Sequence, residues 1–370
     1  MPRSDSQTRD SGDTPPLLTS PGEVKQPPRP KLIEIMGPGL ITGASDDDPS
    51  GIATYSQAGA EFGYGLAWTL LITYPLMCAI QQISGEIGRV TGRGLAGSLR
   101  RHYAAWLLYA IVILLLIANA INIGADLGAM AASLKLLIGG PALVYVGLFA
   151  LLTVLLEVFV RYSRYVSVLK WLTLSLFAYV ATVFVVHVPL SQVAEQLVPH
   201  LAVNKNYVVA IVAVFGTTIS PYLFFWQAEE EVEDQMERPG ALPLKSAPEQ
   251  APKELNRIRL DTYVGMAFSN LVALAIVLTA AATLHAHGKT DIATSAQAAE
   301  ALRPIAGPFA FWVFALGIIG TGLLALPVLA GSAAYALGEA FRWPVGLARR
   351  PLKAKRSMER LRSRRSSERC

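Results

Sequence analysis

The stretch that decides the fold is Asp46-Asp47-Asp48-Pro49-Ser50-Gly51, which interrupts an otherwise apolar run from Leu32 to Gly63. Lipid cannot hydrogen-bond to three carboxylates or to a backbone broken by proline. Such a segment therefore persists at bilayer depth only where protein or a water-filled cavity surrounds it. Ionisable side chains inside a membrane span indicate a functional site. We therefore expect the rest of the chain to hold these acids within a membrane.

The composition is that of a membrane protein. Hydrophobic residues make up 52% and charged residues only 16% of the 370 positions, which excludes both a soluble and a disordered chain. The two cysteines, Cys78 and Cys370, are too few for a disulfide framework or a metal knuckle, which argues against redox chemistry. The pI is near 9.1, but 11 of the 32 basic residues follow Phe341. This distribution indicates membrane topology rather than nucleic-acid binding.

We predict an all-α polytopic membrane protein with about eight transmembrane helices, because roughly 20 apolar residues cross a bilayer. The first span starts near Leu32, and the others lie near 65–88, 103–130, 141–161, 166–187, 207–227, 262–284 and 308–340. Residues 1–30 have no apolar periodicity and are expected to form a disordered tail. The membrane domain is then predicted at 31–342, with helices 1–5 at 31–188 and helices 6–8 at 206–342, followed by a basic tail at 343–370.

Basic residues predict the orientation of these spans, because cytoplasmic flanks collect Lys and Arg. With the N-terminus inside, the inside segments hold 28 of the 32 basic residues. Only Lys135, Lys205, Lys289 and Arg303 fall on the other side. We therefore predict that both termini are cytoplasmic. The N-terminal segment does not have the pattern of a signal peptide.

The sixth span contains a second predicted break, at Thr217-Thr218-Ile219-Ser220-Pro221-Tyr222. A proline removes one helical hydrogen bond and clashes with the preceding turn, so the helix should kink or unwind just before Pro221. Spans one and six begin two halves of the chain, and interrupted helices in corresponding positions indicate a transporter binding site at the midplane. Carbonyl and carboxylate oxygens are the donors offered there, and they favour hard ions such as magnesium, manganese or calcium.

The third span has a polar face formed by Asn119, Asn122 and Asp126. Two interpretations stay open for Asp126: an ion or proton relay, and a hydrogen bond between helices. For the two asparagines we favour the hydrogen bond. Gly124 and Gly128 form a small-xxx-small pair, which predicts close helix packing.

An acidic run, Glu229 to Asp234, opens a polar and Pro-rich stretch that reaches Arg259. We interpret this stretch as a solvated cytoplasmic connector, because charge runs usually lie in water. The alternative is a vestibule that collects cations.

Four motifs carry a family resemblance: Gly37-Pro38-Gly39, Asp48-Pro49, Gly59-Ala60-Glu61-Phe62-Gly63-Tyr64 and Thr91-Gly92-Arg93. Together they resemble the first two helices of the natural resistance-associated macrophage protein (Nramp) family of divalent metal transporters, over roughly Leu32 to Trp343. The resemblance implies a leucine-transporter-type fold of two inverted five-helix repeats. It also implies that the transported ion lies between unwound helices one and six.

The resemblance implies a metal site as well. The family motif Asp-Pro-Gly-Asn corresponds to Asp48-Pro49-Ser50-Gly51, so Asp48 is retained and the asparagine ligand is lost at Gly51. The family motif Met-Pro-His corresponds to Ser220-Pro221-Tyr222, so the thioether and the imidazole are lost. The candidate metal residues are then Asp48, the carbonyls of Ser45 and Thr217, the hydroxyl of Ser220, and the altered positions Gly51 and Tyr222.

These departures resemble the magnesium-transporting, proton-uncoupled branch related to the Nramps. Of the two acids in the family's Asp-x-x-Glu pattern in helix three, this chain retains the first, Asp126. The resemblance therefore makes Asp126 the candidate ion relay. Asp46 and Asp47 are expected to set the local field or to hold waters, because magnesium usually keeps several.

The resemblance ends after about Glu339. Residues Lys353 to Cys370 include eight Lys or Arg and no apolar run. Helices nine and ten of the family are absent from this sequence, so the second repeat is expected to be incomplete. Two explanations stay open: a frameshift or early stop, and a natural short variant with a basic tail.

We expect the chain to move a divalent cation by alternating access in a bacterial inner membrane, without a cofactor. The alternatives are a non-transporting remnant or metal-responsive sensor, and an organic-substrate transporter of the same fold. Three consecutive acids favour an inorganic cation over the organic substrate. We find no nucleophile elbow, phosphate loop or catalytic acid pair in the sequence and therefore predict no enzyme. The sequence makes no prediction of oligomeric state.

Overall fold

Every regular element in the described part of the chain is a helix. The structure is a computed structural model that describes residues 38–159, 177–186, 188–199, 204–238 and 240–343. These residues belong to the unit Met36–Cys370, and the unit Met1–Ile35 lies outside them. The predicted tail at 1–30, most of the predicted tail at 343–370 and part of the predicted span at 166–187 also lie outside the described residues.

The described residues form twelve α-helices and two 3₁₀ turns. In chain order they are α2 (Pro38–Asp46), α3 (Pro49–Phe62), α4 (Ala67–Thr91), α5 (Leu95–His102), α6 (Ala105–Ile138), α7 (Ala142–Phe159), α9 (Phe177–Val185), α10 (Leu190–Gln196), α11 (Lys205–Thr218), α12 (Pro221–Glu237), the 3₁₀ turn η2 (Pro248–Gln250), α13 (Ala251–Thr283), the 3₁₀ turn η3 (His285–His287) and α14 (Ser295–Phe341).

The first apolar run is broken where the sequence predicts it. Helix α2 ends at Asp46 and α3 begins at Pro49, with Asp48 as its N-cap in extended conformation (φ −69°, ψ 164°). A residue before proline is driven out of the helical region, and proline is tolerated at the first helical position because that N–H has no partner there. Local sterics therefore place the break at Asp47 and Asp48.

The second predicted break is also present. Helix α11 ends at Thr218 and α12 begins at Pro221, with Ser220 extended (φ −82°, ψ 126°). A third interruption lies within α14, where Gly307 has non-helical dihedrals (φ 85°, ψ 173°) just before Pro308. The predicted eighth span at 308–340 therefore corresponds to the part of α14 that follows this kink.

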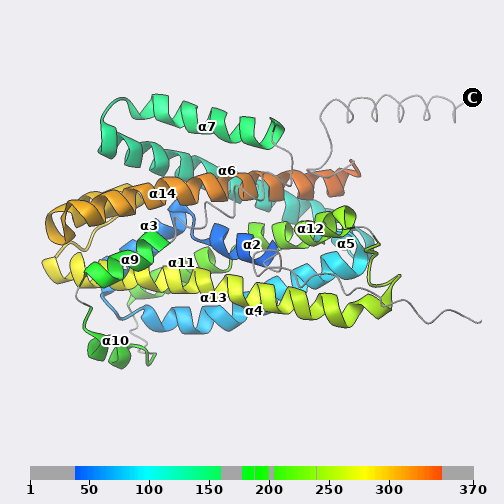
Figure 1. Cartoon of the computed structure of the whole chain (residues 1–370), viewed down its shortest axis with the longest axis horizontal. Helices are drawn as coiled ribbons and strands as arrows, with labels where there is room; N and C mark the ends of the chain where they lie inside the picture. The colour runs from blue at the N-terminus through cyan, green and yellow to red at the C-terminus, as the bar shows by residue number, and fades with distance from the viewer. Residues whose placement is uncertain (1–37, 160–176, 187, 200–203, 239, 344–370) are drawn as a thin grey trace, which may run out of the picture. The chain divides into compact units, whose positions relative to one another are not determined.

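The two short helices α2 and α3 pack against long ones (Figure 1). Helix α13 contacts α2, α3 and α4, while α14 runs alongside α6. The approach of α2 to α13 depends on glycine, since a Cβ atom at Gly43 would collide with the backbone carbonyl of Gly265. At the start of α2, the Asp261 carboxylate accepts a hydrogen bond from the Gly39 amide at 2.7 Å. These contacts hold the first helix break inside the helix assembly.

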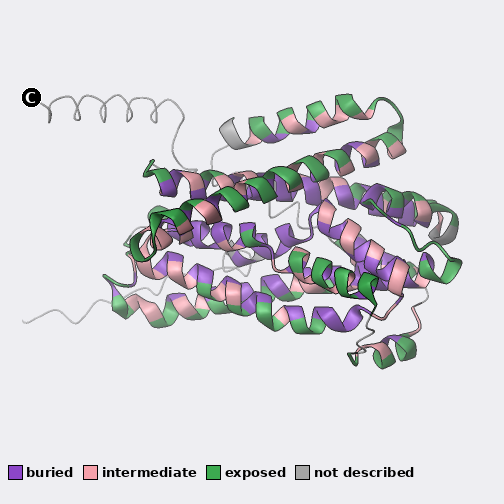
Figure 2. Ribbon diagram, turned by 180° about the vertical axis from the view of Figure 1, so that it is seen from behind, coloured by how far each residue is buried: buried purple, intermediate pink, exposed green. Residues whose placement is uncertain are grey.

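The long helices carry exposed residues along one face (Figure 2), and many of these residues are large and apolar. On α6, for example, Ile113, Leu114 and Ile117 are 55%, 67% and 53% exposed, which suits contact with lipid. Within the described residues, four helical stretches are long and apolar enough to cross a membrane: Ala105–Ile138, Lys205–Glu237, Pro248–His287 and Gly307–Phe341. The larger count of about eight spans stays a prediction.

Candidate metal site

The two helix breaks lie against each other. The Tyr222 hydroxyl on α12 donates a hydrogen bond to the Ser45 carbonyl on α2 at 2.7 Å. The Tyr55 hydroxyl on α3 lies 3.1 Å from Thr218 Oγ1 on α11. A Cβ atom at Gly51 would lie 3.1 Å from Thr217 Oγ1. Segments 163 to 177 residues apart in sequence therefore share one polar centre.

Asp48 provides the carboxylate of this centre. It is 3% exposed and caps the N-terminus of α3. Its Oδ1 atom accepts hydrogen bonds from the Gly51 amide at 2.6 Å and from the Ser50 hydroxyl at 2.7 Å. These bonds fix the orientation of the carboxylate, because an N-cap side chain accepts from the first turn of its helix.

Two backbone carbonyls at helix ends belong to the same two breaks. Ser45 lies in the last turn of α2 and Thr217 in the last turn of α11. The last four carbonyls of a helix have no partner within that helix, and they carry the negative end of its dipole. The Ser220 hydroxyl donates to the Thr217 carbonyl at 2.7 Å, as Tyr222 does to Ser45. Each carbonyl has a second lone pair available for a cation.

Asp126 and Asp48 both form a hydrogen bond with Ser50. The Ser50 amide donates to Asp126 Oδ1 at 3.1 Å, while the Ser50 hydroxyl is bonded to Asp48. Asp126 Oδ2 is buried and has no hydrogen-bond partner among the described residues. Asn119, by contrast, donates to the Leu329 carbonyl at 2.8 Å and to Ser332 Oγ at 2.9 Å. The hydrogen bond between helices favoured for Asn119 is therefore present, and Asp126 remains with the candidate site.

Asp46 and Asp47 take no part in the hydrogen bonds of Asp48. Asp46 Oδ2 accepts from the Ser269 hydroxyl of α13 at 2.8 Å. Within the described residues, Asp46 Oδ1 and both carboxylate oxygens of Asp47 have no hydrogen-bond partner. In the same part of the chain, no group of three or more His, Cys, Asp and Glu side chains is arranged to hold a metal. A cation here would therefore be held by carbonyl and hydroxyl oxygens together with few carboxylates.

A cavity of about 730 Å³ opens beside the site. Pro49 and Ser50 line one part of it, and the segment from Asp291 to Ala296 lines another. Gly124 and Gly128 also line it, and a Cβ atom at either would meet nothing within 4 Å. The prediction that these glycines bring two helices into close packing is wrong for the described residues. Their lack of side chains leaves open space next to the Asp48 segment.

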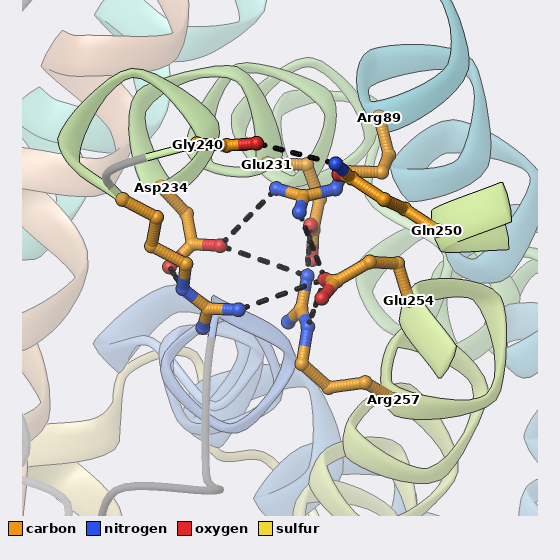
Figure 3. A network of polar contacts seen from close by, with 8 residues as sticks. Arg89, Glu231, Asp234, Gly240, Gln250, Glu254 and Arg257 are labelled. Atoms are coloured by element: carbon orange, nitrogen blue, oxygen red, sulfur yellow. Dashed lines mark hydrogen bonds and ion pairs between the residues drawn. The ribbon is translucent and has the colours of Figure 1, made fainter. Parts of the chain in front are cut away.

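A second cluster of charge joins the ends of α4, α12 and α13 (Figure 3). Arg89, 1% exposed, lies 2.9 Å from Glu254 and 3.5 Å from Asp234. Arg257 forms an ion pair with Glu231 and a second with Glu254 at 3.0 Å. The acids of this cluster are matched by arginines from other helices.

This cluster corrects the interpretation of the acidic run. The residues from Glu229 to Asp234 are helical and belong to α12, and all of the glutamates among them are buried. The connection to the next helix spans only residues 238–250. The solvated connector predicted from Glu229 onward is therefore wrong. Within this run, Arg89 and Arg257 form ion pairs with Glu231 and Asp234, which offsets the cost of removing these two acids from water.

Several residues of the site were not identified from the sequence. Tyr55 and Ser50 bond to the candidate ligands or their neighbours, and Ser269 bonds to Asp46. Ser269 is a polar residue inside an apolar span, and this pattern could have marked it as a residue of the site. Ser50 and Tyr55 both lie within about two helical turns of Asp48. Their hydrogen-bond partners are known only once the helices are packed.

Comparison with protein families identifies the family of this chain. A sequence model described as natural resistance-associated macrophage protein-like matches residues 39–359. The divalent metal cation transporter MntH of Aeromonas hydrophila subsp. hydrophila is 28% identical over 312 residues, which cover 80% of this chain and 71% of that protein. MntH of Yersinia pestis (strain Pestoides F) is 29% identical over 313 residues, which cover 81% and 71%.

Solved structures show the same likeness in fold. The Eremococcus coleocola manganese transporter, in complex with an aromatic bis-isothiourea substituted compound, superposes with a TM-score of 0.67 at 18% sequence identity. That superposition covers 86% of this chain and 68% of the other. A mutant of the same transporter gives 0.66 at 17% identity and covers 91% and 70%.

Proposed function

The chain belongs to the natural resistance-associated macrophage protein-like family, and on that premise we propose that it carries a divalent metal cation across a membrane. Members of this family are metal transporters and not enzymes. The metal is the substrate of the reaction and not a resident cofactor. The curated relatives are named divalent metal cation transporters, and the superposed structures are named manganese transporters.

One observation carries the proposal. The oriented carboxylate of Asp48 lies at the first helix break, and hydrogen bonds from Tyr222 to Ser45 and between Tyr55 and Thr218 join that break to the second. The carbonyls of Ser45 and Thr217 contribute neutral oxygens, and the Ser220 hydroxyl lies beside the second of them. Unwound helix ends of this kind replace water oxygens around an ion and can release it again. We propose these residues, with Gly51 and Tyr222 at the adjoining positions, as the ion site and Asp126 as its relay.

The donor chemistry sets the class of ion that we propose. Carboxylate, carbonyl and hydroxyl oxygens suit hard cations such as Mg²⁺ and Mn²⁺, while softer ions prefer sulfur or imidazole. At the position of the family's methionine this chain has Ser220, and at that of its histidine it has Tyr222. We infer that the site takes a magnesium-like or manganese-like ion and that its movement does not require protons.

The finer architecture is part of the same proposal. We infer a leucine-transporter-type arrangement of inverted repeats, with α2 and α3 forming the first broken helix and α11 and α12 forming the sixth. Alternating access would then open the site to one side of the membrane at a time. We infer that both termini are cytoplasmic and that the membrane is a bacterial inner membrane.

Uptake into liposomes tests the proposal. The purified full chain is reconstituted, and the entry of Mg²⁺ and Mn²⁺ is followed with a metal-sensitive dye while a second dye reports internal pH. We expect uptake of both ions without acidification of the lumen. Binding of the ions without uptake would instead support a metal-responsive membrane protein that does not transport. Absence of both binding and uptake would contradict the proposal.

A further inference from the structure

The two oxygens of the Asp48 carboxylate are not equivalent. Oδ1 accepts two short hydrogen bonds, from the Gly51 amide at 2.6 Å and from the Ser50 hydroxyl at 2.7 Å. Two donors at these distances occupy the lone pairs of Oδ1. An ion that approaches this side chain therefore meets Oδ2.

The consequence is a restriction on how the carboxylate binds an ion. Ca²⁺ takes six to eight oxygens and gains from carboxylates that coordinate through both oxygens. Mg²⁺ requires a near-octahedral set of ligands, keeps several waters and is satisfied with one oxygen from each carboxylate. A carboxylate that offers only Oδ2 favours the smaller ion over calcium. No sulfur ligand is needed for this discrimination.

Ser50 is suited to enforce the restriction. Its backbone amide bonds to Asp126 and its hydroxyl bonds to Asp48, so removing the hydroxyl leaves the backbone contacts in place. Ser50 is only partly buried and lines the cavity, which gives water access to the ion. The family motif Asp-Pro-Gly-Asn has glycine at this position, so the hydroxyl is a departure from that motif.

We propose that the Ser50 hydroxyl determines the ion preference of the site by holding Asp48 to coordination through one oxygen. Ser50 is a positioning residue in this scheme, because it acts on the ion through Asp48. The inference rests on the proposed function, since it assumes that Asp48 is an ion ligand. It explains how the site can bind Mg²⁺ in preference to Ca²⁺ although the family's methionine and asparagine are absent.

Ion titrations of serine variants test the inference. The purified full chain and its Ser50→Ala and Ser50→Thr variants are titrated with MgCl₂, MnCl₂ and CaCl₂ by calorimetry. Losing one charge-assisted hydrogen bond to Oδ1 should raise Ca²⁺ affinity relative to Mg²⁺ by about tenfold in Ser50→Ala. Ser50→Thr keeps a hydroxyl and should keep the wild-type ratio.

The controls separate positioning from structure. Ser56→Ala is the matched control, because Ser56 lies on the same helix, is 1% exposed and has no hydrogen-bond partner among the described residues. It should leave the ion ratio unchanged. Ser50→Gly is a second variant without the hydroxyl and serves if the alanine variant does not fold.

Three outcomes are informative. A calcium-to-magnesium ratio that rises in Ser50→Ala or Ser50→Gly and is restored in Ser50→Thr supports the inference. Equal losses of affinity for all ions, or an unchanged ratio, would overturn the inference and leave the proposed function standing. A wild-type chain that binds none of the three ions would overturn the proposed function, and this inference with it.

Discussion

Two groups of buried charge differ in how their charges are balanced. At the ends of α4, α12 and α13, Arg89 and Arg257 are matched with Glu231, Asp234 and Glu254. At the helix breaks, Asp46, Asp47, Asp48 and Asp126 are buried, and no Lys, Arg or His of the described part of the chain lies within ion-pair distance of them. The first group carries its own counter-charge, and the second does not.

The difference separates a structural role from a functional one. A paired and hydrogen-bonded charge cluster can stay buried without a ligand, and it fixes the helices that contribute to it. Carboxylates without a partner are costly in a membrane interior unless a cation joins them. The comparison predicts that variants of the arginine cluster change stability, while variants of the aspartates change ion binding.

The largest expected effect lies in the arginine cluster. Arg89→Ala removes the buried partner of Asp234 and Glu254, which keep only Arg238 and Arg257. This loss should lower the free energy of unfolding by about 3 kcal/mol, the lower end for breaking a buried ion pair. Thermal unfolding in detergent measures this effect. Arg238→Ala is the control, because that side chain is 40% exposed while it pairs with the same two acids. It should cost at most about 1 kcal/mol. Equal losses in both variants would contradict the assigned structural role.

The next effect concerns Asp48. Asp48→Ala should lower Mg²⁺ and Mn²⁺ affinity at least about hundredfold, or ~2.8 kcal/mol of binding free energy, because the carboxylate proposed as the charged ligand is lost. Calorimetric titration measures the affinity, and circular dichroism checks that the helices persist. Unchanged affinity in a folded variant would refute the assignment of Asp48 as ligand.

Asp47 should behave differently from its neighbour. Asp47→Asn removes a buried charge whose oxygens have no partner in the described chain. It should raise the thermal stability of the metal-free protein by about 1 kcal/mol, because a buried unpaired charge is costly. Metal affinity should fall only about tenfold, through loss of nearby negative charge. A fall as large as that of Asp48→Ala would make Asp47 a direct ligand.

The smallest effect is expected at Tyr222. Tyr222→Phe removes the hydrogen bond to the Ser45 carbonyl that joins the two breaks. Affinity for Mn²⁺ should fall by a factor of about 5, because one neutral hydrogen bond contributes ~1 kcal/mol. Tyr145→Phe is the control, because its hydroxyl bonds to the Gly139 carbonyl in an exposed turn. A similar change in both variants would contradict a role for Tyr222 in orienting the site.

Much of the fold is readable from local sequence. Pro49 and Pro221 predict the two helix breaks because proline acts on the turn that precedes it, wherever the helix later packs. The acidic run in α12 was misread for the opposite reason. Two of its acids, Glu231 and Asp234, form ion pairs with Arg89 and Arg257, and Arg89 is 145 residues from Asp234 in sequence. No local pattern contains that pairing.

The candidate site is readable in part. An acid inside an apolar span marks Asp48, whereas the occupation of its Oδ1 depends on how Ser50 and Gly51 turn at the start of α3. Gly124 and Gly128 show the limit of a motif. The small-xxx-small pattern favours close packing, but the same absence of side chains also leaves space for a cavity. Only the arrangement of the neighbouring helices decides between the two.

The most direct test of the account is to locate the ion. Crystals of the full chain soaked in MnCl₂ can be measured at a wavelength where manganese scatters anomalously. The account predicts one strong peak between the two helix breaks, within coordination distance of Asp48 Oδ2 and of the Ser45 and Thr217 carbonyls. A peak at Asp46 and Asp47, or none near either break, would contradict it.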